Sequence, residues 1–261
     1  MKVEEERNME LQGLLIVCPL VFLAGFVDAI AGGGGIISLP AYLFAGIPPH
    51  MALGTNKLSS TSGTLISTIR YMKNGYLKGI GLLAALAAVA AIAGSAAGSR
   101  IALFVPGKII ENLMLIVLPV VAFFVLRNKS FSEEKEAQPL PGKKRIVLTL
   151  AAAFGIGMYD GLYGPGTGTF LLLVLTGITH LSMKQASAAT KIINLASNVS
   201  ALITFLVSGS VDYRLGIAGA VCCIAGHYVG AGMVVKDGTK IVKPVVIFVL
   251  AALFIKVILG K

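Results

Sequence analysis

The sequence predicts an all-α integral membrane protein with about eight transmembrane helices, built as two homologous repeats with broken helices at paired glycine-rich turns. Three observations support this fold class. The composition is too apolar for a soluble protein, several apolar runs are long enough to span a bilayer, and one glycine-rich motif occurs at matching places in both halves. Together they predict a polytopic protein whose helices are interrupted where the motif occurs.

The composition fits a membrane environment. Of the 261 residues, 56% are hydrophobic and 13% are charged, and the mean hydropathy is +0.87. Soluble domains are usually about 25% charged. The net charge of +10 is carried by Lys and Arg in short segments between the apolar runs, which is typical of loops that flank membrane spans. We therefore expect a multi-pass membrane protein with no nucleic-acid partner.

Eight apolar runs are predicted to cross the membrane, where a spanning helix needs about 20 residues. They lie near residues 11–26, 58–71, 77–105, 109–126, 146–159, 192–207, 215–235 and 241–259. Two further runs, 36–45 and 169–178, are too short to cross and are predicted to be half-helices. Residues 1–10 are acidic and no small-residue cleavage site follows, so we expect the first span to be retained.

The two halves resemble each other at a nearly constant spacing of 132 or 134 residues, which predicts an internal duplication. We expect a first repeat at residues 11–126, a cytoplasmic connector at 127–145 and a second repeat at 146–259. The pattern leaves open whether the repeats are inverted or parallel. The matched landmarks are Asp28 and Asp160, Gly32 and Gly164, Gly34 and Gly166, Asn56-Lys57 and Thr190-Lys191, and Gly94-x-x-x-Gly98 and Gly226-x-x-x-Gly230.

Two glycine-rich turns are the first candidates for a binding site. An unwound backbone in lipid must be enclosed by protein or line a watery cavity, and such breaks in both halves indicate the binding site of a transporter. The half-helices, expected to begin at Ile36 and Thr169, would present N–H groups and a positive dipole end to an anion. The alternative is that the glycines only allow close helix packing. The turns hold Gly32, Gly33, Gly34 and Gly35, and Gly164, Gly166, Thr167 and Gly168.

Asp28 and Asp160 precede the two turns and are candidates for proton coupling or for stabilising the turns. A carboxylate inside a membrane segment is costly and marks a functional site by default. The alternative is that each accepts hydrogen bonds from N–H groups freed by its own turn. Tyr159, Tyr163 and Thr167 offer hydroxyl donors near Asp160. We therefore expect Asp28 to be the titrating carboxylate and Asp160 to be more structural.

A lysine opens a polar-studded helix in each half. Polar residues recur there at intervals of four, so each helix carries one polar stripe, which we predict to line a path. The alternatives are that the stripes only bond neighbouring helices and that the lysines snorkel to the interface. The stripes are Asn56, Ser60 and Thr64 beside Lys57, and Thr190, Asn194 and Asn198 beside Lys191. The predicted substrate-binding residues are Gly32, Gly33, Gly34, Gly35, Asn56, Lys57, Ser60, Gly164, Gly166, Thr167, Gly168, Thr190, Lys191 and Asn194.

Other reactive side chains give no sign of a metal site, a disulfide framework or a catalytic centre. The histidines lack the four-residue spacing of a helical zinc site. The cysteines lie in apolar runs and are expected to be inert buried thiols. Because no Ser, Thr or Cys has a recognisable catalytic partner, we expect no cofactor, no metal and no enzymatic activity. The residues considered are His50, His180, His227, Cys18, Cys222 and Cys223.

Four longer motifs carry a family resemblance. They are Gly25-Phe-Val-Asp28-Ala-Ile-Ala-Gly-Gly-Gly-Gly-Ile-Ile-Ser-Leu-Pro40, Ala52-Leu-Gly-Thr-Asn-Lys57, Gly161-x-x-Gly164-x-Gly-Thr-Gly168 and Ala188-Ala-Thr-Lys191. With them the chain resembles the TauE/SafE family of sulfite exporters and related permeases, from about residue 11 to residue 259. The resemblance implies a bacterial or archaeal permease of the cytoplasmic membrane that moves sulfite, sulfonates or other small organosulfur anions, driven by the proton gradient. The second turn has Gly-Pro-Gly and no Asn precedes Lys191, so unequal halves are expected.

The leading functional prediction is a secondary transporter for a small anion. The alternatives are an anion channel and a non-transporting membrane scaffold assembled through small-residue helix faces. A scaffold has no use for costly charges inside the membrane. A channel would show current without saturation, whereas a transporter would show saturable, gradient-coupled flux. The expected partners are a small anionic substrate and membrane lipid, with a homo-oligomer left open.

Overall fold

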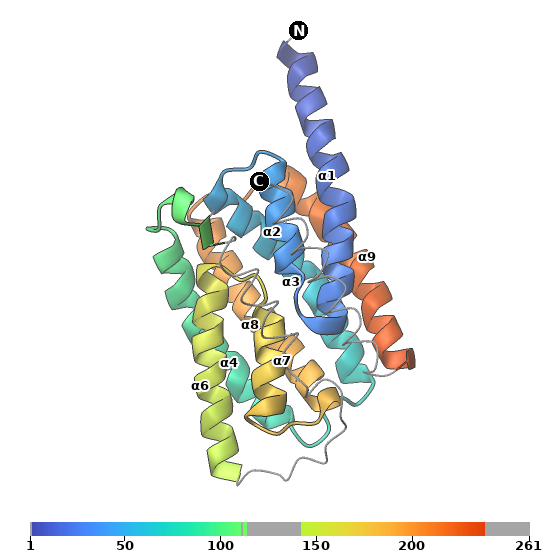
Figure 1. The fold of residues 1–261 in the computed structure, drawn as a ribbon, viewed down its shortest axis with the longest axis vertical. Helices are drawn as coiled ribbons and strands as arrows, with labels where there is room; N and C mark the ends of the chain where they lie inside the picture. The colour runs from blue at the N-terminus through green and yellow to red at the C-terminus, as the bar shows by residue number, and fades with distance from the viewer. Residues whose placement is uncertain (1, 111, 114–141, 238–261) are drawn as a thin grey trace.

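The computed structural model describes residues 2–110, 112–113 and 142–237, and this part of the chain is helical without strands. Figure 1 shows the helices as a bundle in which the two short ones, α2 and α7, lie among the long ones. The helices are α1 (Lys2–Ala31), α2 (Gly35–Phe44), α3 (Pro49–Lys73), α4 (Gly81–Ala102), α6 (Gly142–Leu162), α7 (Thr167–Gly177), α8 (Met183–Val207) and α9 (Tyr213–Asp237).

Five helices in the described residues are long and apolar enough to cross a membrane. They are Leu11–Ala31, Gly81–Ala102, Gly142–Leu162, Met183–Val207 and Tyr213–Lys236. The span predicted at 58–71 forms most of α3, which has 25 residues. Its polar stripe lowers its hydropathy, so it is not among the five. The runs predicted at 109–126 and 241–259 lie almost entirely outside the described residues.

The helix boundaries correct the predicted starts of both half-helices. The half-helices were expected at Ile36 and Thr169, but α2 begins at Gly35 and α7 at Thr167. The second turn needs fewer residues than expected because Gly166, with a φ of 86°, reverses the chain directly before α7. Residues 142–145, assigned to the connector, form the first turn of α6.

Helices at corresponding places in the two halves run in opposite directions. In Figure 1, α1 descends from the N-terminus and α6 ascends, and α4 ascends while α9 descends. The short helices follow the same rule, since α2 rises from the end of α1 and α7 descends from the end of α6. The sequence left this relative orientation open.

Two helix pairs approach each other closely through glycines. α4 packs along α6, and α1 packs along α9. A Cβ atom on any of these glycines would meet backbone atoms of the neighbouring helix, so only glycine allows the observed approach. The small-residue faces predicted from the sequence therefore serve packing. The contacts are Gly94 with Phe154, Gly98 with Met158, Gly226 with Phe22, and Gly230 with Phe26.

Candidate functional site

The two glycine-rich turns meet inside the bundle. The Thr169 N–H donates to the Gly32 carbonyl at 3.0 Å, and the Thr169 hydroxyl donates to the Ala31 carbonyl at 3.2 Å. The backbones of Gly32 and Gly168 are in direct contact, so a Cβ on either one would overlap the other. Gly32 also has a φ of +78°, which favours glycine. The two turns are therefore in direct contact, as we expected from the matched motifs.

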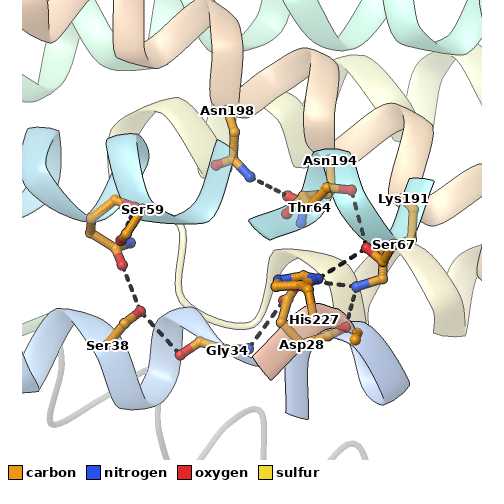
Figure 2. Close-up of polar contacts among 12 residues, drawn as sticks. Asp28, Gly34, Ser38, Ser59, Thr64, Ser67, Lys191, Asn194, Asn198 and His227 are labelled. Atoms are coloured by element: carbon orange, nitrogen blue, oxygen red, sulfur yellow. Dashed lines mark hydrogen bonds and ion pairs between the residues drawn. The ribbon is translucent and has the colours of Figure 1, made fainter. Parts of the chain in front are cut away.

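Asp28, near the end of α1, is held by Lys191 and by the backbone N–H of Gly34 through three contacts. Lys191 Nζ lies 2.9 Å from Asp28 Oδ2 and also donates to the backbone carbonyl of Asp28. The Gly34 N–H donates to Asp28 Oδ1 at 3.2 Å, and Figure 2 shows this cluster. The carboxylate therefore caps its own turn and also pairs with a lysine of α8.

Asp160 pairs with the other lysine but does not cap its turn in the same way. Lys57 Nζ lies 2.8 Å from Asp160 Oδ1 and donates to Asn198 Oδ1 at 2.9 Å. The Ser197 hydroxyl donates to Asp160 Oδ2 at 2.7 Å. The ligands of this carboxylate come from α3 and α8.

The two ion pairs cross between the halves of the chain. Each lysine binds the aspartate of the other half, and the four charges sum to zero. The side chains of Lys57 and Asp160 are 2% and 3% exposed, and those of Lys191 and Asp28 are 3% and 12% exposed. Because both lysines are buried, they do not snorkel to an interface. Asp28 is the more accessible of the two carboxylates.

A small cavity of about 20 Å³, partly open to the surroundings, lies where the turns and the polar helices meet. Most of the predicted site residues line it, together with Asn198 of the predicted α8 stripe. Gly33, Gly34, Thr190 and Lys191 do not. Lys191 reaches the cavity through its partner Asp28, whereas the Thr190 side chain is buried away from it. The lining residues are Asp28, Gly32, Gly35, Asn56, Lys57, Ser60, Asp160, Gly164, Gly166, Thr167, Gly168, Asn194 and Asn198.

The polar stripes use only part of their hydrogen-bonding capacity. Ser38 donates to Asn56 Oδ1 at 2.5 Å, and Asn198 Nδ2 donates to Asn194 Oδ1 at 3.4 Å. Five buried hydroxyls on α3 and α8 have no hydrogen-bond partner in the structure. Buried polar groups are normally satisfied, so such a set calls for an explanation such as water or a polar solute. The hydroxyls are those of Thr61, Thr64, Thr68, Ser187 and Thr190.

The hydroxyls expected to hold Asp160 point elsewhere. Tyr159 donates to the Pro165 carbonyl at 2.5 Å, and Thr167 donates to the Gly164 carbonyl at 2.6 Å. The Tyr163 hydroxyl has no partner. The predicted contacts are wrong because these side chains close their own glycine turn, while the carboxylate of Asp160 is directed towards α3 and α8.

His227 is not among the predicted site residues, but in the structure it lies beside Asp28. Its side chain is 1% exposed, and its Nε2 lies 3.5 Å from Asp28 Oδ2. Its Nδ1 lies 3.0 Å from the Ser67 hydroxyl oxygen, as Figure 2 shows. A signal was present in the sequence, because His227 follows Gly226 of the second Gly-x-x-x-Gly motif, whereas Ser95 follows the matched Gly94.

Comparison with known proteins gives a consistent result. Residues 17–257 match the family model described as sulfite exporter TauE/SafE. The chain is 36% identical over 239 residues to a probable membrane transporter protein, ORF9, of Sinorhizobium sp, covering 91% of this chain and 89% of that protein. It is 30% identical over 234 residues to a probable membrane transporter protein of Haemophilus influenzae, covering 90% of each.

A further relative is the probable membrane transporter protein YfcA of Escherichia coli K12. The two are 29% identical over 254 residues, which cover 94% of this chain and 92% of YfcA. No solved structure matches the chain. The family and the relatives are named as transporters rather than enzymes, and five apolar helices fit a multi-pass protein. The chain therefore belongs to the TauE/SafE family and is a membrane transporter.

Proposed function

We propose that this transporter is a secondary permease that moves sulfite, a sulfonate or a related small organosulfur anion across the cytoplasmic membrane, coupled to the proton gradient. The observation that carries the proposal is the crossed pairing of two buried lysines with two buried carboxylates around one cavity. Intramembrane charges are costly and mark substrate and proton pathways. The site holds both the cations that an anion needs and carboxylates that can take up protons.

The pairing supplies a physical reason for coupling. While Asp28 and Asp160 are ionised, each lysine is already neutralised. An anion that enters would bring uncompensated negative charge into a weakly polar environment, which is unfavourable. If one carboxylate takes up a proton, its lysine becomes available to the anion, and the charge of the site stays at zero. Proton uptake and anion binding are therefore favourable together and unfavourable separately.

The remaining groups of the cavity suit the oxygens of a small oxyanion. Asn56, Asn194 and Asn198 offer side-chain amides, and Ser60 offers a hydroxyl. The first residues of α2 and α7 also line the cavity, so both half-helices direct the positive ends of their dipoles to it. The fit is to a compact anion with several acceptor oxygens, a property that sulfite and sulfonate groups share.

The helix directions support a two-repeat architecture of the inverted type. The matched sequence landmarks and the opposite directions of α1 and α6, and of α4 and α9, both fit halves that are related by a two-fold axis in the membrane plane. In transporters of this kind the substrate lies at the repeat interface, and alternating access is a rocking of one part against the other. The contact between the turns and the crossed ion pairs would lie on that interface.

The test is anion flux into proteoliposomes that contain the purified protein. With radiolabelled sulfite, and with methanesulfonate as a second probe, we expect uptake that saturates with concentration and accumulates against a gradient when the external pH is lower than the internal pH. Flux that never saturates and follows only the membrane voltage would favour the channel. Absence of flux for both anions would remove these substrates from the proposal.

A further inference from the structure

We infer that His227 Nε2 and Asp28 Oδ2 together form the proton-binding site of this transporter, and that the Asp160 pair has no such site. The inference deepens the proposed function, because it rests on anion transport being coupled to protons. It starts from the 3.5 Å distance between these two buried atoms. The proposed function gives His227 no role.

The Ser67 hydroxyl allows two neutral tautomers of His227. Its single proton can go to the Thr64 carbonyl oxygen, 3.1 Å away, or to His227 Nδ1, 3.0 Å away. In the first case Nδ1 carries the imidazole proton and Nε2 is bare, and in the second case Nε2 carries it and faces Asp28. In both cases one ring nitrogen can take up a further proton.

A protonated imidazole would fit both of its polar neighbours at once. Its Nδ1–H would donate to the Ser67 hydroxyl, and its Nε2–H would face Asp28 Oδ2, 3.5 Å away. Because a buried charge needs a partner, the Asp28 carboxylate would stabilise the proton on the ring. The imidazolium would also compete for Asp28 with Lys191, whose ammonium lies 2.9 Å from the same carboxylate oxygen.

The chain makes room for this histidine at one position. A Cβ on Gly63 of α3 would overlap the His227 ring. At the matched position of the second half, 134 residues later, the chain has Ser197, whose hydroxyl donates to Asp160. At the position matched to His227 it has Ser95, which donates to the Ser197 carbonyl at 2.6 Å. One carboxylate thus has an imidazole beside it and the other has a hydroxyl donor.

Among the described residues, the charged neighbours of His227 are Asp28 of α1 and Lys191 of α8. From α3 it meets Gly63 and Ser67, and from its own helix Cys223 lies one turn away, beside the same Gly63. The repulsion between Lys191 and a protonated imidazole opposes proton uptake, and the negative charge of an anion in the cavity beside Asp28 offsets this repulsion. Anion binding and proton uptake at His227 therefore reinforce each other.

The experiment compares sulfite uptake into proteoliposomes with and without an inwardly directed proton gradient. The variants are His227→Asn, the double variant Gly63→Ser with His227→Ser, and the control Ser95→Ala. The double variant copies at Asp28 the groups that surround Asp160, so it keeps a buried donor set if His227→Asn alone fails to fold. Folding is checked for each variant by monodispersity in detergent and by thermal unfolding.

We expect Ser95→Ala to respond to the proton gradient like the wild type. We expect a folded His227→Asn or double variant to lose the response, so that uptake with and without the gradient becomes equal and no longer changes with pH. A folded variant without His227 that keeps the wild-type pH profile would overturn the inference. A wild type that transports sulfite but ignores the proton gradient would instead refute the proton coupling of the proposed function.

Discussion

The ammonium of Lys57 in the first half lies 2.8 Å from the carboxylate of Asp160 in the second, and neither group could remain buried as a charge without the other. In the second ion pair the halves are reversed, because the lysine, Lys191, comes from the second half and the aspartate, Asp28, from the first. Removing one member of a buried pair leaves an uncompensated charge, which is more damaging than losing both.

We expect Lys57→Ala and Lys191→Ala to reduce anion transport strongly. Each should also lower the free energy of unfolding by about 3 to 5 kcal/mol, because it leaves a buried carboxylate without its cation. The measurement is sulfite uptake at subsaturating concentration together with thermal unfolding in detergent. The double variant Lys57→Ala with Asp160→Ala is the control, because it removes both charges and should recover most of the stability but not the transport. Normal uptake by both single variants would contradict a role for the lysines in binding.

The two aspartates are expected to differ in their effect on the pH dependence of flux. Anion binding should increase as the pH falls, because a protonated carboxylate releases its lysine. Asp28→Asn fixes the neutral form, so its uptake should become independent of pH and fail to accumulate sulfite against a gradient. Asp160→Asn should keep a pH-dependent response at a lower rate. If Asp28→Asn retains gradient-driven accumulation with the wild-type pH profile, then Asp28 only caps its turn.

The contact between the turns should be intolerant of any side chain. Gly32→Ala would introduce a Cβ that overlaps the Gly168 backbone, so we expect loss of folded protein or of all transport. Gly46→Ala is a matched control: its φ of +84° is close to the +78° of Gly32, but open space surrounds it. It should cost only about 1 to 2 kcal/mol for the left-handed conformation. Similar behaviour of the two variants in a thermal unfolding assay would show that backbone strain, not the contact, matters.

The basic residues predict which end of the bundle faces the cytoplasm. The end where α3 and α9 finish and α4, α6 and α8 begin, at the bottom of Figure 1, carries Arg70, Lys73, Lys78, Lys143, Lys144, Arg145, Lys184 and Lys236. The positive-inside rule predicts that this end faces the cytoplasm.

We expect Asn74→Cys at the basic end to resist a membrane-impermeant maleimide in intact cells, in a background with the native cysteines replaced by alanine. Gly209→Cys, in the turn before α9 at the opposite end, should react. Labelling of Asn74→Cys but not of Gly209→Cys would show that the basic end faces outward instead.

Much of this architecture could be predicted from local sequence, because its determinants are local. The glycine runs end helices, and residues repeated at intervals of four place the polar stripes on one face. The turns, half-helices and most cavity residues follow from such patterns. The pairing of Lys57 with Asp160 could not be predicted, since it depends on how the halves pack. For the same reason Tyr159 was given the wrong partner and His227 was overlooked: a helix pattern gives the face of a side chain but not what lies opposite it.

The exchange of charges between the halves also bears on how the protein is made. Asp28 and Lys57 are synthesised and enter the membrane before Lys191 and Asp160 exist, so the first half is inserted with two charges whose final partners are still missing. An isolated first half would therefore hold two costly intramembrane charges without the partners that they have in the folded chain. The same is true of Asp160 and Lys191 in an isolated second half. The crossed pairs can form only when both halves are present.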